Sequence, residues 1–198
     1  QCLARKHRRR QGWTYFSKTH GNQIPFRIDI SERPERINQR QEFGHWEADQ
    51  IVSRSSSYVL SVLVERTSRL VKIARLNDKT ALLQMASIRR RLTGLTAACV
   101  KSITYDNGPE NALHYRLNKV LNTDSYFCKP YHSWEKGTVE NTNGLIRRYL
   151  PKKTDFSLIS LKIIKAIENT LNNRPRKCLQ FKTPNEVFYK AISGALSH

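Results

Sequence analysis

Three acidic residues, Asp49, Asp106 and Glu140, carry the most specific chemical signal in this sequence. Asp49 lies within the first expected strand, Asp106 follows a later strand directly, and Glu140 lies near the start of an expected helix. If the two strands are parallel neighbours, their ends lie side by side and the two aspartates approach each other. A helix packed across that edge brings Glu140 to the same point.

Three converging carboxylates repel one another unless they share a cation. Mg²⁺ prefers carboxylate oxygens, keeps several waters and is often completed by substrate phosphates. Two such ions about 3.5–4 Å apart activate an attacking oxygen and stabilise a leaving one in a displacement at phosphorus. A purely structural alternative stays open, because Asp106-Asn107-Gly108 suits any sharp turn and Glu140 suits the N-terminal end of a helix dipole.

The whole chain is strongly basic, with 35 Lys and Arg against 16 Asp and Glu and a formal net charge of +19 over 198 residues. A surplus of this size indicates a polyanionic partner, with nucleic acid first and an anionic membrane second. No apolar run approaches a membrane-spanning length, and the basic N-terminus lacks the apolar core of a signal peptide. We therefore expect nucleic acid, and no membrane, as the partner.

The cysteines and histidines indicate neither a zinc site nor a disulfide framework, because no spacing fits one. Reduced thiols in a cytoplasmic protein are the expectation. The chain begins with Gln1 and its only methionine is Met85, so we expect a fragment or a processed product. The cysteines are Cys2, Cys99, Cys128 and Cys178.

Hydrophobic periodicity predicts the elements that must position the carboxylates. Strands are expected at 46–52, 58–65, 70–76, 100–105 and 125–128. Helices are expected at 79–92, 113–121, 138–149, 158–173 and, as a short terminal helix, from Pro184. The first three strands are joined by short turns and form an antiparallel meander. The order predicts an α/β fold with a mixed five-stranded sheet and helices on both faces.

Three ranges describe the expected domain organisation. Residues 1–40 are read as a basic arm that is either a solvated tail or a segment that tracks phosphates. Residues 41–190 are expected to form the main domain and 191–198 a tail.

Several motifs around the carboxylates resemble one known family. They are HWEAD at 45–49, ITYDNG at 103–108 and KPYHSWEKGTVENTNGLIRRYLPK at 129–152, with NNRPRKCL at 172–179 and TPNEVF at 183–188. Together, in this order, they resemble the catalytic core of bacterial insertion-sequence transposases, and more narrowly the insertion-sequence-thirty family. The resemblance runs from about Arg27 to Phe188.

The resemblance implies a ribonuclease-H-like fold, shared with retroviral integrases, and a catalytic triad of Asp49, Asp106 and Glu140 that holds two Mg²⁺ or Mn²⁺ ions. It implies that water first frees a 3′-hydroxyl at an element end, and that this hydroxyl then attacks target DNA. Arg147 matches the basic residue usually found seven positions after the glutamate. That offset is nearly two helical turns, so Arg147 should face the same way as Glu140.

The sequence departs from the family pattern at two positions. Ala48 stands where the family usually has glycine, and Asn111 follows Glu110 where an aromatic residue is usual. The family's N-terminal helix-turn-helix is not evident, so the upstream DNA-recognition region is expected to be missing.

Further residues are candidates for contacts to DNA. Trp134 either stacks on an unpaired base or plugs the core. Asn141 and Asn143 either bond DNA or metal-bound water, or form a simple polar helix face. Basic candidates position DNA through its phosphates without reading sequence. They are Arg147, Arg148, Lys152, Lys153, Arg174, Arg176 and Lys177.

The sequence thus predicts a bacterial, cytoplasmic, nucleoid-associated DNA transposase core acting on transposon ends and target DNA. Because two ends must be processed, we expect a homodimer or a higher assembly. Two alternatives stay open. One is a nuclease of the same fold that cuts without joining, and the other is a catalytically silent, transposase-derived DNA-binding protein.

Overall fold

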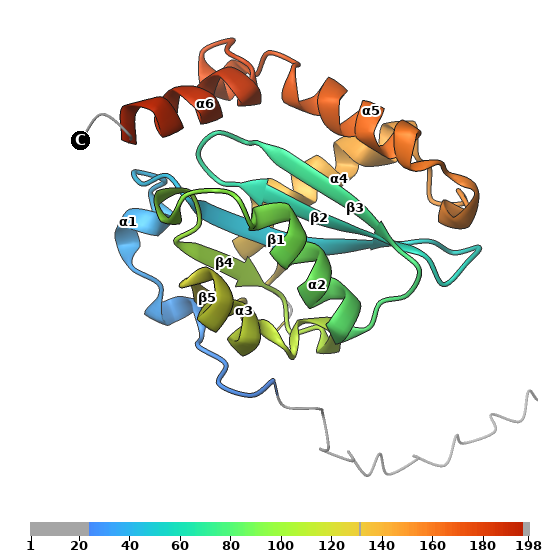
Figure 1. Ribbon diagram of the computed structural model, residues 1–198, viewed down its shortest axis with the longest axis horizontal. Coiled ribbons are helices and arrows are strands. Elements are labelled where there is room, and N and C mark those ends of the chain that lie inside the picture. The colour runs from blue at the N-terminus through green and yellow to red at the C-terminus, as the bar shows by residue number, and fades with distance from the viewer. Residues whose placement is uncertain (1–23, 131, 196–198) are drawn as a thin grey trace, which may run out of the picture.

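A five-stranded mixed sheet lies at the centre of the computed structural model, which describes residues 24–130 and 132–195 (Figure 1). Its strand order is β3-β2-β1-β4-β5. The first three strands pair antiparallel, whereas β1–β4 and β4–β5 pair parallel. The strands are β1 (His45–Val52), β2 (Val59–Glu65), β3 (Val71–Leu76), β4 (Ser102–Tyr105) and β5 (Asp124–Phe127). The predicted meander and the predicted parallel pair that brings the aspartates together are both present.

Helices cover both faces of this sheet, as predicted (Figure 1). They are α1 (Glu35–Asn38), α2 (Ala81–Leu92), α3 (His114–Leu121), α4 (Gly137–Tyr149), α5 (Leu161–Asn172) and α6 (Pro184–Ala195). Because both faces are covered, the central strands read as nearly continuous apolar runs, and all seven residues of β2 are buried.

Each face of the sheet has its own hydrophobic core. One core includes Trp46 and Phe127 of the sheet with Ile88 of α2 and Leu117 of α3. The other core lies under α4 and α5 and includes Val62, Ile73, Val139, Ile146 and Ile164. The second core fixes α4, the helix that carries Glu140, against the sheet.

The C-terminal helix and part of the expected N-terminal arm differ from what the sequence predicts. The helix expected to be short, α6, has 12 residues, and its Phe188 is buried with its ring centroid 6.1 Å from that of Trp46. Residues 24–40 pack on the core: Ile37 is buried, and the buried Arg33 donates to the Thr104 hydroxyl at 3.0 Å. The remainder of the expected arm, residues 1–23, lies outside the described residues.

Across the described ranges, no helix combines the length and the apolar character that crossing a bilayer requires.

Candidate active site

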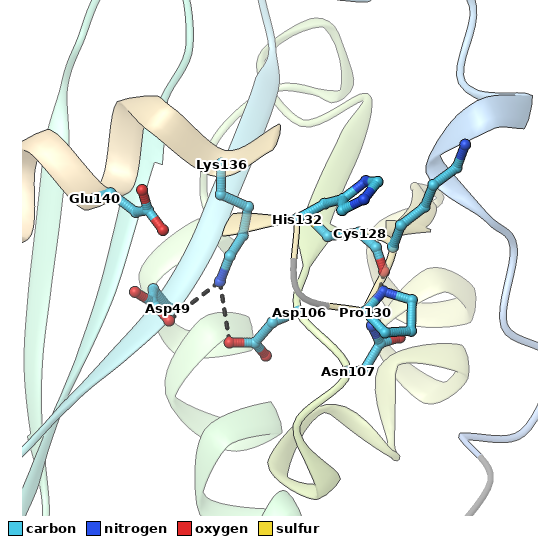
Figure 2. A pocket seen from close by; sticks show the side chains of 9 residues that line it. Asp49, Asp106, Asn107, Cys128, Pro130, His132, Lys136 and Glu140 are labelled. Carbon is cyan, nitrogen blue, oxygen red and sulfur yellow. Dashed lines mark hydrogen bonds and ion pairs between the residues drawn. The ribbon is translucent and has the colours of Figure 1, made fainter. Parts of the chain in front are cut away.

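Asp49 and Asp106 meet at the edge formed by the parallel pair β1–β4. Glu47 is registered with Thr104, so each aspartate follows its registered residue by two positions. Both carboxylates line a pocket of about 330 Å³, together with Glu140 and Lys136 (Figure 2). Its remaining lining residues are Asn107, Cys128, Lys129, Pro130 and His132. The structure therefore brings the three predicted carboxylates to one pocket.

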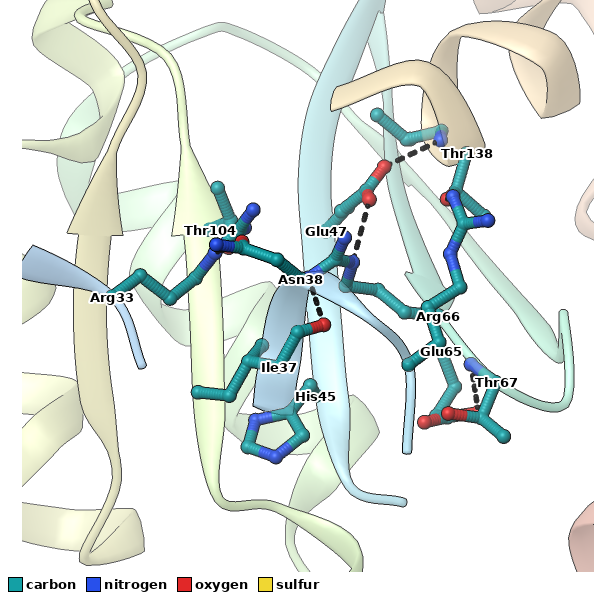
Figure 3. Close-up of polar contacts among 12 residues, drawn as sticks. Arg33, Ile37, Asn38, His45, Glu47, Glu65, Arg66, Thr67, Thr104 and Thr138 are labelled. Carbon is teal, nitrogen blue, oxygen red and sulfur yellow. Dashed lines mark hydrogen bonds and ion pairs between the residues drawn. The ribbon is translucent and has the colours of Figure 1, made fainter. Parts of the chain in front are cut away.

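Glu140 reaches this pocket because the first turn of α4 is tied to β1. The backbone N–H of the buried Val139 donates to Oε2 of Glu47 at 2.9 Å. Glu47 is itself fully buried and ion-paired with Arg66 at 3.0 Å (Figure 3). In Figure 2 the Glu140 side chain extends from α4 toward the side of the pocket where Asp49 lies.

Lys136 joins the two aspartates directly, and the sequence reasoning missed it. Its Nζ lies 3.1 Å from Oδ1 of Asp49, 3.1 Å from Oδ2 of Asp106 and 3.3 Å from the carbonyl oxygen of Ala48. Its side chain is only 5% exposed. The single ammonium thus offsets part of the negative charge of the carboxylate pair. Its position four residues before Glu140 marks it only as a cation near the site, and no spacing in the sequence indicates its contacts with the two aspartates.

Neutral donors orient the remaining carboxylate oxygens. The Asn143 amide donates to Oδ2 of Asp49 at 2.6 Å. The Asn111 amide and the backbone N–H of Gly108 donate to Oδ1 of Asp106 at 2.8 and 3.2 Å. Asn111, one of the two departures from the family pattern, therefore holds a predicted catalytic aspartate in place.

Burial and like charge raise the proton affinity of this pocket. Burial raises the pKa of Asp49, and the charge of Asp106 adds to this against the attraction of Lys136. Burial also raises the pKa of Glu110, a further carboxylate that both aspartates repel. Burial acts to lower the pKa of Lys136, but the attraction of Asp49 and Asp106 outweighs it and raises that pKa above its ordinary value. The pocket therefore favours a bound cation.

The donor set suits a hard divalent cation. In this conformation no three His, Cys, Asp or Glu side chains of the described ranges are already arranged around one metal position. However, one cationic nitrogen already lies within hydrogen-bond distance of both Asp49 and Asp106. Carboxylate oxygens select Mg²⁺ or Mn²⁺ over softer metals. Glu140 borders the same space as the third carboxylate.

The predicted DNA-binding residues lie in different environments. Arg147 donates to the carbonyl of Val52 at 2.8 Å, and its guanidinium lies 5.6 Å from the ring centroid of Phe156. Asn141 and Arg176 line a second cavity beside α4. The side chain of Trp134 lies outside what the structure describes. The other basic candidates are exposed and do not contact the aspartates: Arg148, Lys152, Lys153, Arg174 and Lys177.

Solved structures with this fold are retroviral integrase catalytic cores. The catalytic core domain of BIV integrase matches with a TM-score of 0.60 and 21% identity, over 77% of this chain and 98% of that one. The HTLV-2 integrase catalytic core domain, in complex with magnesium and in a dimeric form, matches with a TM-score of 0.56 and 21% identity, over 74% and 97%. The predicted ribonuclease-H-like fold is confirmed.

Most of the curated relatives found are insertion-sequence transposases, and no model of a known protein family matches the chain. The transposase for insertion sequence element IS4351 from Bacteroides fragilis is 43% identical over 192 residues, which cover 95% of this chain and 59% of the relative. Transposase InsI for insertion sequence element IS30A from Escherichia coli K12 is 36% identical over 195 residues, 98% of this chain and 51% of the relative. The predicted resemblance to insertion-sequence transposases is confirmed, and the chain spans between half and three-fifths of their length.

Proposed function

We propose that this chain is the catalytic core of a DNA transposase that cuts and joins DNA strands at the Asp49–Asp106–Glu140 pocket. The observation that carries the proposal is the convergence of Asp49 and Asp106 on one cationic nitrogen, beside Glu140, in an integrase-core fold. The similarity to transposases over nearly the whole chain supports the same reaction class.

The three carboxylates would hold Mg²⁺ or Mn²⁺, with two ions in the site. The HTLV-2 integrase core with magnesium supports this choice of ion. Bound divalent ions supply activation of the attacking oxygen and stabilisation of the leaving oxygen in an in-line displacement. Asn143 and Asn111 keep the carboxylate oxygens aimed at the shared position, since outer partners of this kind fix the direction of metal ligands. For an ion to bind between the aspartates, Lys136 would have to leave that position, and its positive charge would then be free to contact the substrate phosphate.

The reaction proceeds in two displacements at phosphorus. A water oxygen attacks the phosphodiester at the transposon end, and the bond to the 3′ oxygen breaks and leaves a 3′-hydroxyl. That hydroxyl loses its proton and attacks a phosphodiester of target DNA, whose own 3′ oxygen leaves. The number of phosphodiester bonds is conserved in the second step, so no covalent bond between protein and DNA is needed.

The surroundings of the pocket agree with DNA as the substrate. The net charge of +19 favours a polyanion, and the exposed basic residues named above would contact its backbone. Two transposon ends require two active sites, and the dimeric form of the HTLV-2 core supports a homodimer or a higher assembly. We infer that the assembly works on bacterial chromosomal DNA in the cytoplasm.

The test is a strand-cleavage and strand-transfer assay on labelled DNA ends with Mn²⁺. Wild-type chain is compared with Glu140→Gln and Asp106→Asn, and with Glu32→Gln as an exposed control outside the pocket. We expect cut and joined products from the wild type and the control only. Products from Glu140→Gln would refute the triad.

Two further outcomes separate the alternatives. Cut products without joined products, on a substrate that already carries a free 3′-hydroxyl, would identify a nuclease. Metal-independent DNA binding with no products, also from a longer chain of the length of the relatives, would identify a silent DNA-binding protein.

A further inference from the structure

A second cavity, of about 230 Å³, lies on the other flank of α4 from the acidic pocket. Thr138 and Asn141 of α4 line it, whereas Glu140 lines the acidic pocket. At about 100° per residue, Thr138 and Glu140 are about 200° apart around the helix, so the two hollows flank α4 on opposite sides. The other lining residues are Arg69, Thr142, Arg176 and Cys178.

Arginines from three distant parts of the chain gather at this cavity, which we call the arginine pocket. Arg69 comes from the β2–β3 turn, Arg176 follows α5, and Arg40 follows α1. Arg40 and Arg69 both donate to the hydroxyl oxygen of Thr138, each at 3.1 Å. Two guanidinium charges therefore share one neutral acceptor.

No carboxylate of the described residues forms an ion pair with Arg40, Arg69 or Arg176. The nearby buried carboxylate, Glu47, is already paired with Arg66. Arg69 and Arg176 are half-buried, and half-buried structural arginines are normally paired, because an uncompensated buried charge is costly. The arginine pocket therefore has the charge of an anion site without an internal anion.

Two details show donors left over for a ligand. Nη2 of Arg176 donates a hydrogen bond to the carbonyl of Leu171 at 3.1 Å, whereas its buried Nε has no hydrogen-bond partner in the described structure. Burial and the charges of Arg174 and Arg69 lower the pKa of Arg176, and burial and the charge of Arg40 lower that of Arg69. The cations repel one another until an anion is present.

The outer face of α4, between the acidic pocket and the arginine pocket, is exposed to solvent and carries two glycines. Gly137, Asn141, Gly144 and Arg148 recur there at helical spacing and are all exposed. A Cβ built on Gly137 or Gly144 meets no atom within 4 Å, so core packing does not require glycine at either position. A glycine inside a helix costs about 1 kcal/mol relative to alanine, and close approach of another backbone is the usual reason for it.

We propose that duplex DNA lies over this face of α4 and places one phosphate in the arginine pocket, between Arg69, Arg176 and Asn141. Planar guanidinium groups match the tetrahedral oxygens of phosphate through paired hydrogen bonds. The N-terminal end of α4 adds a favourable dipole. The cavity is smaller than the 300–1,000 Å³ typical of small-molecule sites, but it holds one phosphate. The proposal rests on DNA being the substrate of the proposed function.

The spacing makes duplex DNA the preferred ligand. A helix with its side chains is about 10–12 Å across, which is close to the width of about 12 Å of the major groove. A duplex can therefore present one phosphate to each flank of α4, whereas a single strand must bend around the helix to do so.

The test measures binding of a fluorescent duplex by anisotropy, in EDTA, over a series of salt concentrations. Arg176→Gln removes one guanidinium, and Asn141→Asp places a carboxylate at an exposed position that makes no hydrogen bond in the described structure. We expect roughly tenfold weaker binding for each. The slope of log K against log salt should become smaller by about 0.9, as for one lost phosphate. Arg89→Gln, an exposed arginine on α2, is the matched control and should keep wild-type values.

A second variant guards against effects of misfolding. Gly144→Leu removes a glycine from the middle of α4 at an open position, so it should raise the free energy of unfolding by up to about 1 kcal/mol. It should nevertheless weaken duplex binding, because a side chain then stands where the backbone approaches. A protein that is more stable but binds more weakly cannot be explained by loss of folding.

Wild-type affinity and salt slope in Arg176→Gln, Asn141→Asp and Gly144→Leu would overturn the proposal, even if an acidic peptide binds at the arginine pocket instead. This result would leave the acidic triad standing, because the binding assay contains no metal. Absence of duplex binding by the wild type would refute both proposals. Absence of cleavage with normal binding would refute only the triad.

Discussion

Replacing Lys136 by methionine, which has a similar length and no charge, tests whether this lysine stands in for a metal ion. The ammonium lies 3.1 Å from one oxygen of each aspartate. At an effective dielectric constant of 20, each attraction amounts to about 5 kcal/mol before the cost of desolvation. Loss of one partner from a buried ion pair costs about 3–5 kcal/mol in practice. Because the Asp106 side chain is 40% exposed, water screens its share, and we expect a loss near the lower end of this range.

The assay is urea unfolding at neutral pH, first in EDTA and then with Mn²⁺. In EDTA, Lys136→Met should be less stable than the wild type by about 3 kcal/mol. With Mn²⁺ at about 100 times its dissociation constant, the variant should regain about 2.7 kcal/mol. The wild type should gain less at the same concentration, because the ion must first displace the ammonium. Lys162→Met, an exposed lysine on α5, is the control for loss of charge alone.

Equal stability of Lys136→Met and the wild type in EDTA, with equal stabilisation of both by Mn²⁺, would refute this reasoning. It would mean that the two aspartates tolerate each other without a cation between them.

Two further predictions concern single contacts. Asn143→Ala removes the donor to Oδ2 of Asp49 and should lower Mn²⁺ affinity about 10–100-fold, measured by calorimetry; unchanged affinity would show that this amide does not orient the carboxylate. Burial lowers the pKa of His114 below its ordinary value of about 6.5. Because the unfolded chain then binds the proton at higher pH, stability from this group is complete above about pH 6.5 and falls as the pH drops through the folded pKa. His114→Gln keeps a donor for the Pro25 carbonyl but cannot titrate. In urea unfolding at several pH values, the variant should lose less stability than the wild type as the pH falls below about 6.5. An equal loss in both proteins would show that His114 does not cause this pH dependence.

The sheet could be predicted because each strand carries its own local signal. The run 58–65 is apolar and β-branched, and the structure places it at the centre of the meander as β2 (Val59–Glu65). Convergence of Asp49 and Asp106 also followed from sequence, since it requires only that two strands be parallel neighbours. The triad's role in catalysis remains a prediction.

The partners of the carboxylates could not be predicted in the same way. Lys136 reaches Asp106 across 30 residues of sequence, and the ion pair of Arg66 with Glu47 depends on the exact register of β1 and β2. Such contacts are set by side-chain directions after folding, and no periodicity reports them. Asn111 was noted only as a departure from a pattern, although its amide holds Asp106.

The two anchors of α4 on β1 have a consequence for how this kind of protein can change in length. Glu47, near the start of β1, holds the first turn of α4, and the carbonyl of Val52, at its end, holds Arg147 in the last turn. A single eight-residue strand thus carries Asp49 and also fixes the helix that carries Glu140. The connection from β5 to α4 does not determine the distance between these carboxylates. Insertions near residues 129–132 should therefore be tolerated at a cost of only about 0.6 kcal/mol for each doubling of the loop. Homologous proteins can consequently vary the number of residues between the second aspartate and the glutamate without altering the distance between the carboxylates on β1 and α4.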